Sequence, residues 1–123
     1  MIVLKSPREL ELMRKAGSIV ARILSELTAM IKPGVSTGEL NSYAESRCVA
    51  LKARPAFKGY RDFPASLCIS INDEIVHGIP SDSRLLKEGD IVSLDFGACY
   101  ESWYGDAACT VPVGSISKEA ERL

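Results

Sequence analysis

Residues 90–97, DIVSLDFG, and residues 103–113, WYGDAACTVPV, decide how this chain folds. The first stretch alternates polar and apolar side chains, which is the period of a strand with one buried face. The second stretch can return beside the first, because a hairpin turning near Glu101-Ser102 would bring the two together. These residues therefore predict two adjacent strands of an antiparallel sheet.

Each of the two stretches carries a carboxylate. Asp95 has apolar neighbours, where a carboxylate is costly unless it is paired, hydrogen-bonded or bound to a metal. The hairpin would place Asp95 opposite Ala107 or Ala108, close to Asp106, and a bulge at Gly105 would turn both carboxylates to one face. A divalent cation would relieve the repulsion between them. The alternative is one Asp hydrogen-bonded to backbone and one exposed in a turn.

Upstream of the hairpin, the chain contains a further strand pattern and its single histidine. Residues 66–71, SLCISI, predict a strand, and residues 75–80, IVHGIP, predict an extended segment after a turn at 72–74. His77 lies near the end of that segment. A histidine in this place is either a hydrogen-bonded structural residue or a donor or ligand at a site, and spacing alone leaves both open.

Two amphipathic helices are predicted before the strands. Ser6 begins the first with a capping box that Glu9 completes, and residues 32–34, KPG, end it. Ser36 and Glu39 form a second capping box. Apolar residues recur at helical spacing at Leu10, Met13, Ala16, Val20, Ile23, Leu24, Leu27 and Ile31, and again at Leu40, Tyr43, Ala44, Cys48 and Leu51. Two helices followed by an antiparallel sheet indicate an α+β fold.

Glycine and aromatic residues interrupt these patterns at two places. Gly17 lies inside the first helix, where it either weakens the helix or permits close packing. After Arg54-Pro55 the chain changes character, and a loop follows that carries Phe57, Tyr60 and Phe63. These aromatic side chains either line a pocket or plug an edge of the core.

The composition is that of an ordinary globular protein. The 123 residues are 46% apolar and 25% charged, with a formal net charge of −1. This length supports one domain over residues 1–123. The balanced charge argues against nucleic-acid binding, and no apolar run approaches the roughly 18 residues of a membrane span. Because residues 1–7 lack the core of a signal peptide, we expect a cytoplasmic protein.

Four widely spaced cysteines contain no C-x-x-C pair: Cys48, Cys68, Cys99 and Cys109. A disulfide framework is typical of small secreted chains, and a zinc site needs closely paired ligands. We therefore expect reduced, buried thiols.

A helix start lies close to the last residue. Ser117 is a suitable N-cap, with Glu119 and Glu121 in the first turn that follows it. The sequence stops at Leu123, too early for a helix with stability of its own. We expect Leu123 to be a cut point within a larger protein, the alternative being a docked terminal turn.

The segments KPGVST (32–37), CISINDEIVHGIP (68–80), LKEGDIVSLD (86–95) and YGD (104–106) occur in this order. Together they resemble the bacterial type I methionine aminopeptidases of peptidase family M24. The resemblance covers the whole chain and corresponds to the N-terminal half of the catalytic domain in that family. It implies one half of the pseudo-twofold pita-bread fold, with two helices packed on an antiparallel sheet.

The resemblance also implies roles for individual residues. Asp95 and Asp106 correspond to two of the five protein ligands of two divalent ions. His77 corresponds to the catalytic residue that hydrogen-bonds the substrate and the tetrahedral intermediate, and Asn72 to a site for a monovalent cation. The methionine pocket corresponds to Phe57, Tyr60, Phe63 and Cys68. Relatives often carry a small residue such as Cys at the position of Phe57.

The implied reaction is removal of the initiator methionine from nascent polypeptides by metal-activated water. Co, Mn, Fe, Zn or Ni would suit a site of mixed Asp, His and Glu ligands. One His and two Glu ligands belong to the C-terminal half, which is absent here. We therefore expect weak or no metal binding, an exposed apolar face, and little or no activity from this chain alone. Two alternatives are a non-catalytic module that binds a peptide or partner, and a homodimer in which a second copy replaces the missing half.

Overall fold

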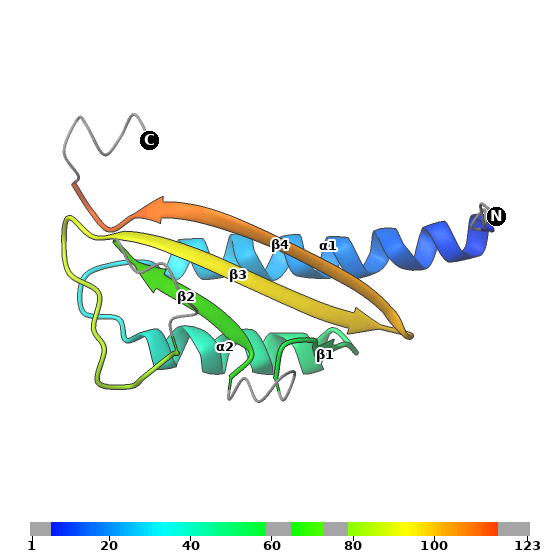
Figure 1. The fold of residues 1–123 in the computed structure, drawn as a ribbon, viewed down its shortest axis with the longest axis horizontal. Coiled ribbons are helices and arrows are strands. Elements are labelled where there is room, and N and C mark those ends of the chain that lie inside the picture. The colour runs from blue at the N-terminus through cyan, green and yellow to red at the C-terminus, as the bar shows by residue number, and fades with distance from the viewer. Residues whose placement is uncertain (1–5, 59–64, 73–78, 116–123) are drawn as a thin grey trace.

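The computed structural model describes residues 6–58, 65–72 and 79–115. The described residues form α1 (Pro7–Met30), α2 (Thr37–Ala50), β1 (Arg54–Pro55), β2 (Leu67–Ile71), β3 (Ile91–Tyr100) and β4 (Trp103–Pro112) (Figure 1). Most of the expected extended segment at 75–80, and the helix expected after Ser117, lie outside the described residues.

The β3–β4 hairpin is the longest feature of the sheet. The two strands pair antiparallel from Ile91↔Pro112 to Tyr100↔Trp103 without interruption, so the expectation of a bulge at Gly105 is wrong. Glu101 and Ser102 form the two-residue loop and have φ values of 47° and 71°. Positive φ at both loop residues is the property of a type I′ turn, whose twist matches that of the flanking strands and keeps the register unbroken.

The other edge of β3 pairs with two shorter strands. β2 is antiparallel to β3 from Leu67↔Phe96 to Ile71↔Val92. β1, which lies just before the predicted loop, is antiparallel to β3 through Arg54↔Cys99 and Pro55↔Ala98. β3 is therefore the central strand, with β4 on one side and β1 and β2 on the other.

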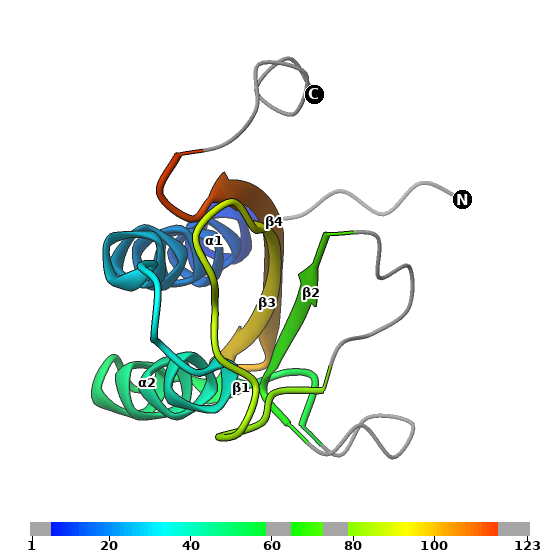
Figure 2. The same cartoon turned by 90° about the vertical axis from the view of Figure 1, so that its left-hand side faces the viewer.

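Both helices cover the same face of this sheet (Figure 2). Ser6 Oγ accepts from the Glu9 N–H at 3.2 Å and the Glu9 carboxylate accepts from the Ser6 N–H at 3.0 Å, so the first capping box is confirmed. Ser36 Oγ accepts from the Glu39 N–H at 3.0 Å, which is one half of the second box. The predicted α+β class, with two helices on an antiparallel sheet, is confirmed.

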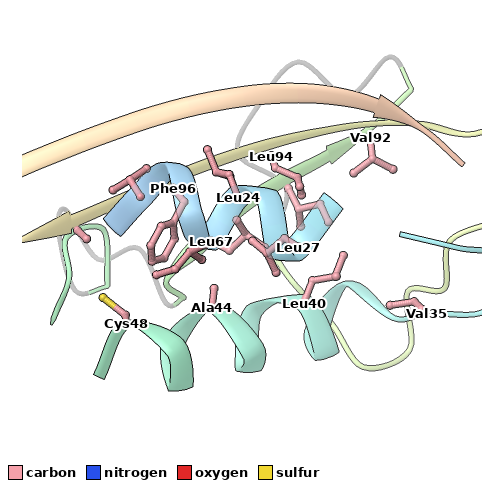
Figure 3. Packing of buried hydrophobic residues seen from close by; sticks show 14 of the residues in the cluster. Leu24, Leu27, Val35, Leu40, Ala44, Cys48, Leu67, Val92, Leu94 and Phe96 are labelled. Carbon is pink, nitrogen blue, oxygen red and sulfur yellow. The ribbon is translucent and has the colours of Figure 1, made fainter. Parts of the chain in front are cut away.

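The hydrophobic core lies between the helices and the sheet. Figure 3 shows Leu24 and Leu27 of α1, Leu40, Ala44 and Cys48 of α2, Leu67 of β2, and Val92, Leu94 and Phe96 of β3 packed together. These residues confirm the predicted apolar stripes. Leu10 is an exception at 43% exposed, because the N-terminal end of α1 extends past the hairpin (Figure 1). Neither helix of the described part of the chain has the length and hydropathy of a membrane span.

Candidate metal centre on the open face of the sheet

The alternation along β3 gives the sheet two different faces. Val92, Leu94 and Phe96 are buried in the core between the helices and the sheet, whereas Ser93 and Asp95, which alternate with them, are exposed on the opposite side. Directly opposed residues of an antiparallel pair share a face, so the register extends this side to β2 and β4. We call this side the open face, formed by Cys68, Ser70, Ser93, Asp95, Gly97, Asp106, Ala108 and Thr110.

The two candidate carboxylates lie on the open face together. Asp95 is opposite Ala108 and Asp106 is opposite Gly97, which makes Asp95 and Asp106 diagonal neighbours. Diagonal neighbours of this kind have their Cβ atoms roughly 7–8 Å apart or somewhat less. Both residues are exposed. No bulge is needed, because Asp106 is two residues from Ala108 and side chains two residues apart share a face.

A hollow of about 420 Å³ opens beside Asp95. Its walls come from β2, β3 and β4 and consist of Cys68, Ser70, Ser93, Leu94, Asp95, Ala108, Cys109 and Thr110. Cys68 is directly opposite Asp95. Burial raises the pKa of the Cys68 thiol, and the charge of Asp95 raises it further. The hollow therefore combines a neutral thiol and small polar groups with one carboxylate.

The Phe57 ring packs against Gly97 near the two carboxylates. A Cβ atom built on Gly97 would lie 2.8 Å from Phe57 Cε1, so only glycine leaves room for the ring there. Phe57 and Cys68 thus lie near Asp106 and Asp95, respectively. The other expected site residues, Tyr60, Phe63 and His77, lie outside the described residues.

Gly97 is a site residue that the sequence reasoning missed. A glycine in the interior of a strand weakens the strand and often marks the close approach of another group. That signal is present at Gly97, which lies two residues after Asp95.

Asn72 has a structural role that the described residues make clear. Its backbone is left-handed, with φ 57°. Its Nδ2 donates to Asp90 Oδ1 at 3.1 Å, and its Oδ1 accepts from the Ile91 N–H at 2.9 Å. The side chain therefore joins the end of β2 to the start of β3. The expected binding of a monovalent cation at Asn72 stays a prediction.

The expectation of an exposed apolar face is wrong for the described residues. Their large exposed hydrophobic side chains are Leu10, Val49, Ile79, Leu85 and Tyr104, and of these only Tyr104 belongs to the sheet. The physical reason is the strand alternation: the apolar residues of β3 point toward the helices, which leaves small and polar side chains on the other face.

All four cysteines are free, as predicted. Cys48 and Cys99 are buried, and burial raises the pKa of the Cys48 thiol to about 11. Cys68 and Cys109 are only partly buried, so the expectation of full burial is wrong for these two. Cys68 lies on the open face, whereas Cys109 faces α1, with its Sγ 4.0 Å from Thr28 Oγ1.

The chemistry of the carboxylates fits a divalent cation, but only as part of a ligand set. Carboxylate oxygens are ligands that hard and borderline divalent ions accept. Among residues 6–58, 65–72 and 79–115, no group of three or more His, Cys, Asp or Glu side chains could hold a metal ion. Asp95 and Asp106 could therefore supply two ligands to a site that needs others.

Comparisons with known proteins place this arrangement in a family. Residues 11–123 match the profile of metallopeptidase family M24. Methionine aminopeptidase 1 of Bacillus subtilis is 52% identical over 123 residues, which is 100% of this chain and 49% of the relative. The crystal structure of methionine aminopeptidase from Thermotoga maritima superposes with a TM-score of 0.95 at 42% identity, covering 100% of this chain and 49% of that one.

A more distant likeness shows the same fold. Prolidase from Pyrococcus furiosus has a TM-score of 0.82 at 25% identity, and the match covers 98% of this chain and 34% of that one. The expected half of a pita-bread fold is thus confirmed, and the chain spans about half the length of the methionine aminopeptidases that it matches. The chain therefore belongs to metallopeptidase family M24, and this membership implies divalent metal ions as cofactors.

Proposed function

We propose that this chain is the N-terminal half of the catalytic domain of a metalloaminopeptidase, which removes the initiator methionine from nascent polypeptides in the cytoplasm. The observation that carries the proposal is the placement of Asp95 and Asp106 on one face of adjacent strands, in a chain with the fold of family M24. In this proposal the two aspartates are ligands of two divalent ions, which are Co, Mn, Fe, Zn or Ni. The remaining ligands come from a second half.

The other site residues have separate tasks in this proposal. Phe57 and Cys68, together with Tyr60 and Phe63, surround the methionine side chain, and an apolar pocket suits a flexible thioether. His77 hydrogen-bonds the substrate near the carbonyl that is attacked. Asn72 contributes a backbone oxygen to a monovalent cation. A bound divalent ion polarises a carbonyl and lowers the pKa of its water.

The experiment joins this chain to the segment of Bacillus subtilis methionine aminopeptidase 1 that the alignment leaves uncovered, and it measures methionine release from Met-Ala-Ser. We expect release that requires a divalent metal and stops when a chelator removes it. Asp95→Asn and Asp106→Asn should each lower kcat/KM by about 100-fold or more, since a metal contributes several kcal/mol of transition-state stabilisation.

Glu101→Gln is the matched control. It makes the same carboxylate-to-amide change on the same hairpin, but at the exposed turn. Its activity should equal that of the unmodified fusion. Full activity of both aspartate variants would contradict the ligand assignment. A folded, metal-loaded fusion that binds Met-Ala-Ser without cleaving it would instead support a non-catalytic peptide-binding module.

A further inference from the structure

Two side chains of α2 contact the chain before and after residues 59–64, at Lys58 and at Ser66-Leu67. Asn41 Oδ1 accepts from the N–H groups of Ser66 and Leu67, at 2.9 and 3.0 Å. Glu45 Oε1 accepts from Ser66 Oγ–H at 2.7 Å and pairs with Lys58 Nζ at 2.8 Å. Asn41 and Glu45 are four residues apart on a helix and therefore lie on the same side of α2.

Glu45 is the residue that joins the two points. The same carboxylate oxygen contacts both Ser66 and Lys58. Ser66 is fully buried, so its hydroxyl needs a partner, and loss of that partner is costly. The Lys58 ion pair is partly exposed and is weak alone. Sharing one carboxylate makes the position of residue 58 depend on that of residue 66.

The residues that Glu45 contacts are next to Phe57 and Cys68, which lie near Asp106 and Asp95. Lys58 directly follows Phe57, whose ring packs against Gly97. Ser66 is two residues before Cys68, which lines the hollow opposite Asp95, and Leu67 between them is held by Asn41. A shift of residue 58 or residue 66 would move Phe57 or Cys68 relative to the other.

We infer that Glu45 is a positioning residue, which sets the separation of Phe57 and Cys68 and with it the width of the pocket for the first side chain of the substrate. Asn41 assists by holding the backbone at Ser66 and Leu67. The use of the pocket rests on the proposed function, whereas the positioning of Cys68 is testable without it.

The first test measures alkylation of Cys68 by iodoacetamide in the 123-residue chain, by mass spectrometry of its peptides. Glu45→Ala should speed alkylation of Cys68 by about 5-fold or more through local opening at the start of β2. Buried Cys48 should stay protected, which shows that the chain is still folded. Lys58→Met removes only the exposed contact, so it should fold normally and give a smaller increase.

Glu26→Gln is the matched control for this test. Glu26 also links α2 to another element through an ion pair, with Arg47 at 2.7 Å, but it lies away from the β2 contacts. Loss of the Glu26–Arg47 ion pair in Glu26→Gln should leave the rate of Cys68 alkylation unchanged. The inference is overturned if Glu45→Ala and Lys58→Met leave the rate at Cys68 unchanged, or if Glu26→Gln raises it as much as Glu45→Ala does.

The second test uses the fused enzyme described above. Glu45→Ala should raise KM for Met-Ala-Ser by about 10-fold and change kcat by less than about 2-fold, because ground-state and transition-state binding are lost equally. Glu26→Gln should change neither constant. The double variant Glu45→Lys/Lys58→Glu, which restores the ion pair with its charges exchanged, should have a KM between those of Glu45→Ala and the unmodified fusion. An equal loss in kcat and kcat/KM would overturn the positioning role. If the unmodified fusion released no methionine, the proposed function would fail, and the alkylation result would still decide the role of Glu45.

Discussion

Gly105 determines how closely β4 approaches α1. A Cβ atom on Gly105 would lie 2.8 Å from the Gly17 backbone N and 2.9 Å from the Ala16 carbonyl carbon. A Cβ atom on Gly17 would meet nothing within 4 Å. The sequence left open whether Gly17 weakens the helix or permits close packing, and the structure shows the close packing. Close packing occurs at Gly17, but the residue that cannot carry a side chain is Gly105.

This asymmetry predicts opposite effects for the same substitution. Gly105→Ala should lower the free energy of unfolding by about 2 kcal/mol, because a new methyl group meets backbone that cannot move aside. Gly17→Ala should raise it by roughly 0.5–1 kcal/mol, because alanine has the higher helix propensity and has open space there. Urea denaturation of both variants measures the two changes. An unchanged free energy of unfolding in Gly105→Ala would show that the contact at Gly105 is not tight, and a destabilised Gly17→Ala would show that the space beside Gly17 is not open.

The two helices are joined by a network centred on Glu26 of α1. Glu26 accepts from Arg47 Nε at 2.7 Å, from the Tyr43 hydroxyl at 2.9 Å and from Arg22 Nε at 3.3 Å. The hydrogen bond from Arg47 is the largest of several causes that lower the pKa of Glu26 from 4.5 to about 2. The link between the two helices therefore depends on an ionised carboxylate.

A lowered pKa predicts the direction of the pH dependence. The contribution of Glu26 is fully present above the unfolded pKa of 4.5 and is lost as the pH falls from there toward about 2. Glu26→Gln should lower the free energy of unfolding at pH 7 by roughly 1 kcal/mol. Urea denaturation between pH 7 and pH 2 measures the free energy of unfolding of the unmodified chain and of Glu26→Gln. The difference between these two free energies should shrink below pH 4.5. A difference that stayed constant to pH 2 would exclude this ionisation as its source.

At the scale of the whole molecule, one side of the sheet is closed by helices and the other carries the candidate site. The helix side holds the hydrophobic core. The open face presents two carboxylates, a hollow and small polar side chains. Such a surface is suited to contact with a further polar or charged element, and this agrees with relatives that are about twice as long.

The number of ligands on the open face predicts how tightly this chain binds metal. Isothermal titration of Mn²⁺ into the 123-residue chain should give weak binding, with a Kd on the order of 0.1–1 mM, because affinity rises with the number of charged ligands. Asp95→Asn should abolish this binding. The fused polypeptide should bind at least about 100-fold more tightly. Submicromolar affinity of the chain alone would show that it already holds a complete ligand set.

Local patterns were sufficient to predict most of the elements. The capping box at Ser6, the apolar stripes of both helices and the polar–apolar alternation of β3 depend on residues close in sequence, and all three appear as expected. The hairpin position also followed from the sequence, because a turn between two strand patterns has few places to form. These features need no knowledge of the rest of the chain.

Contacts between distant residues could not be predicted in the same way. The hairpin did predict Asp95 opposite Ala107 or Ala108, and the structure has Ala108 there. The contact of the Phe57 ring with Gly97 and the hydrogen bonds of Asn41 and Glu45 to Ser66, in contrast, each join separate segments. Periodicity gives the face of a side chain within one strand, but not its neighbour on the next strand, because the relative shift of two segments is set by the packing of all the others. The candidate site residues could therefore be named from the sequence, while the contacts between distant segments came from the tertiary fold.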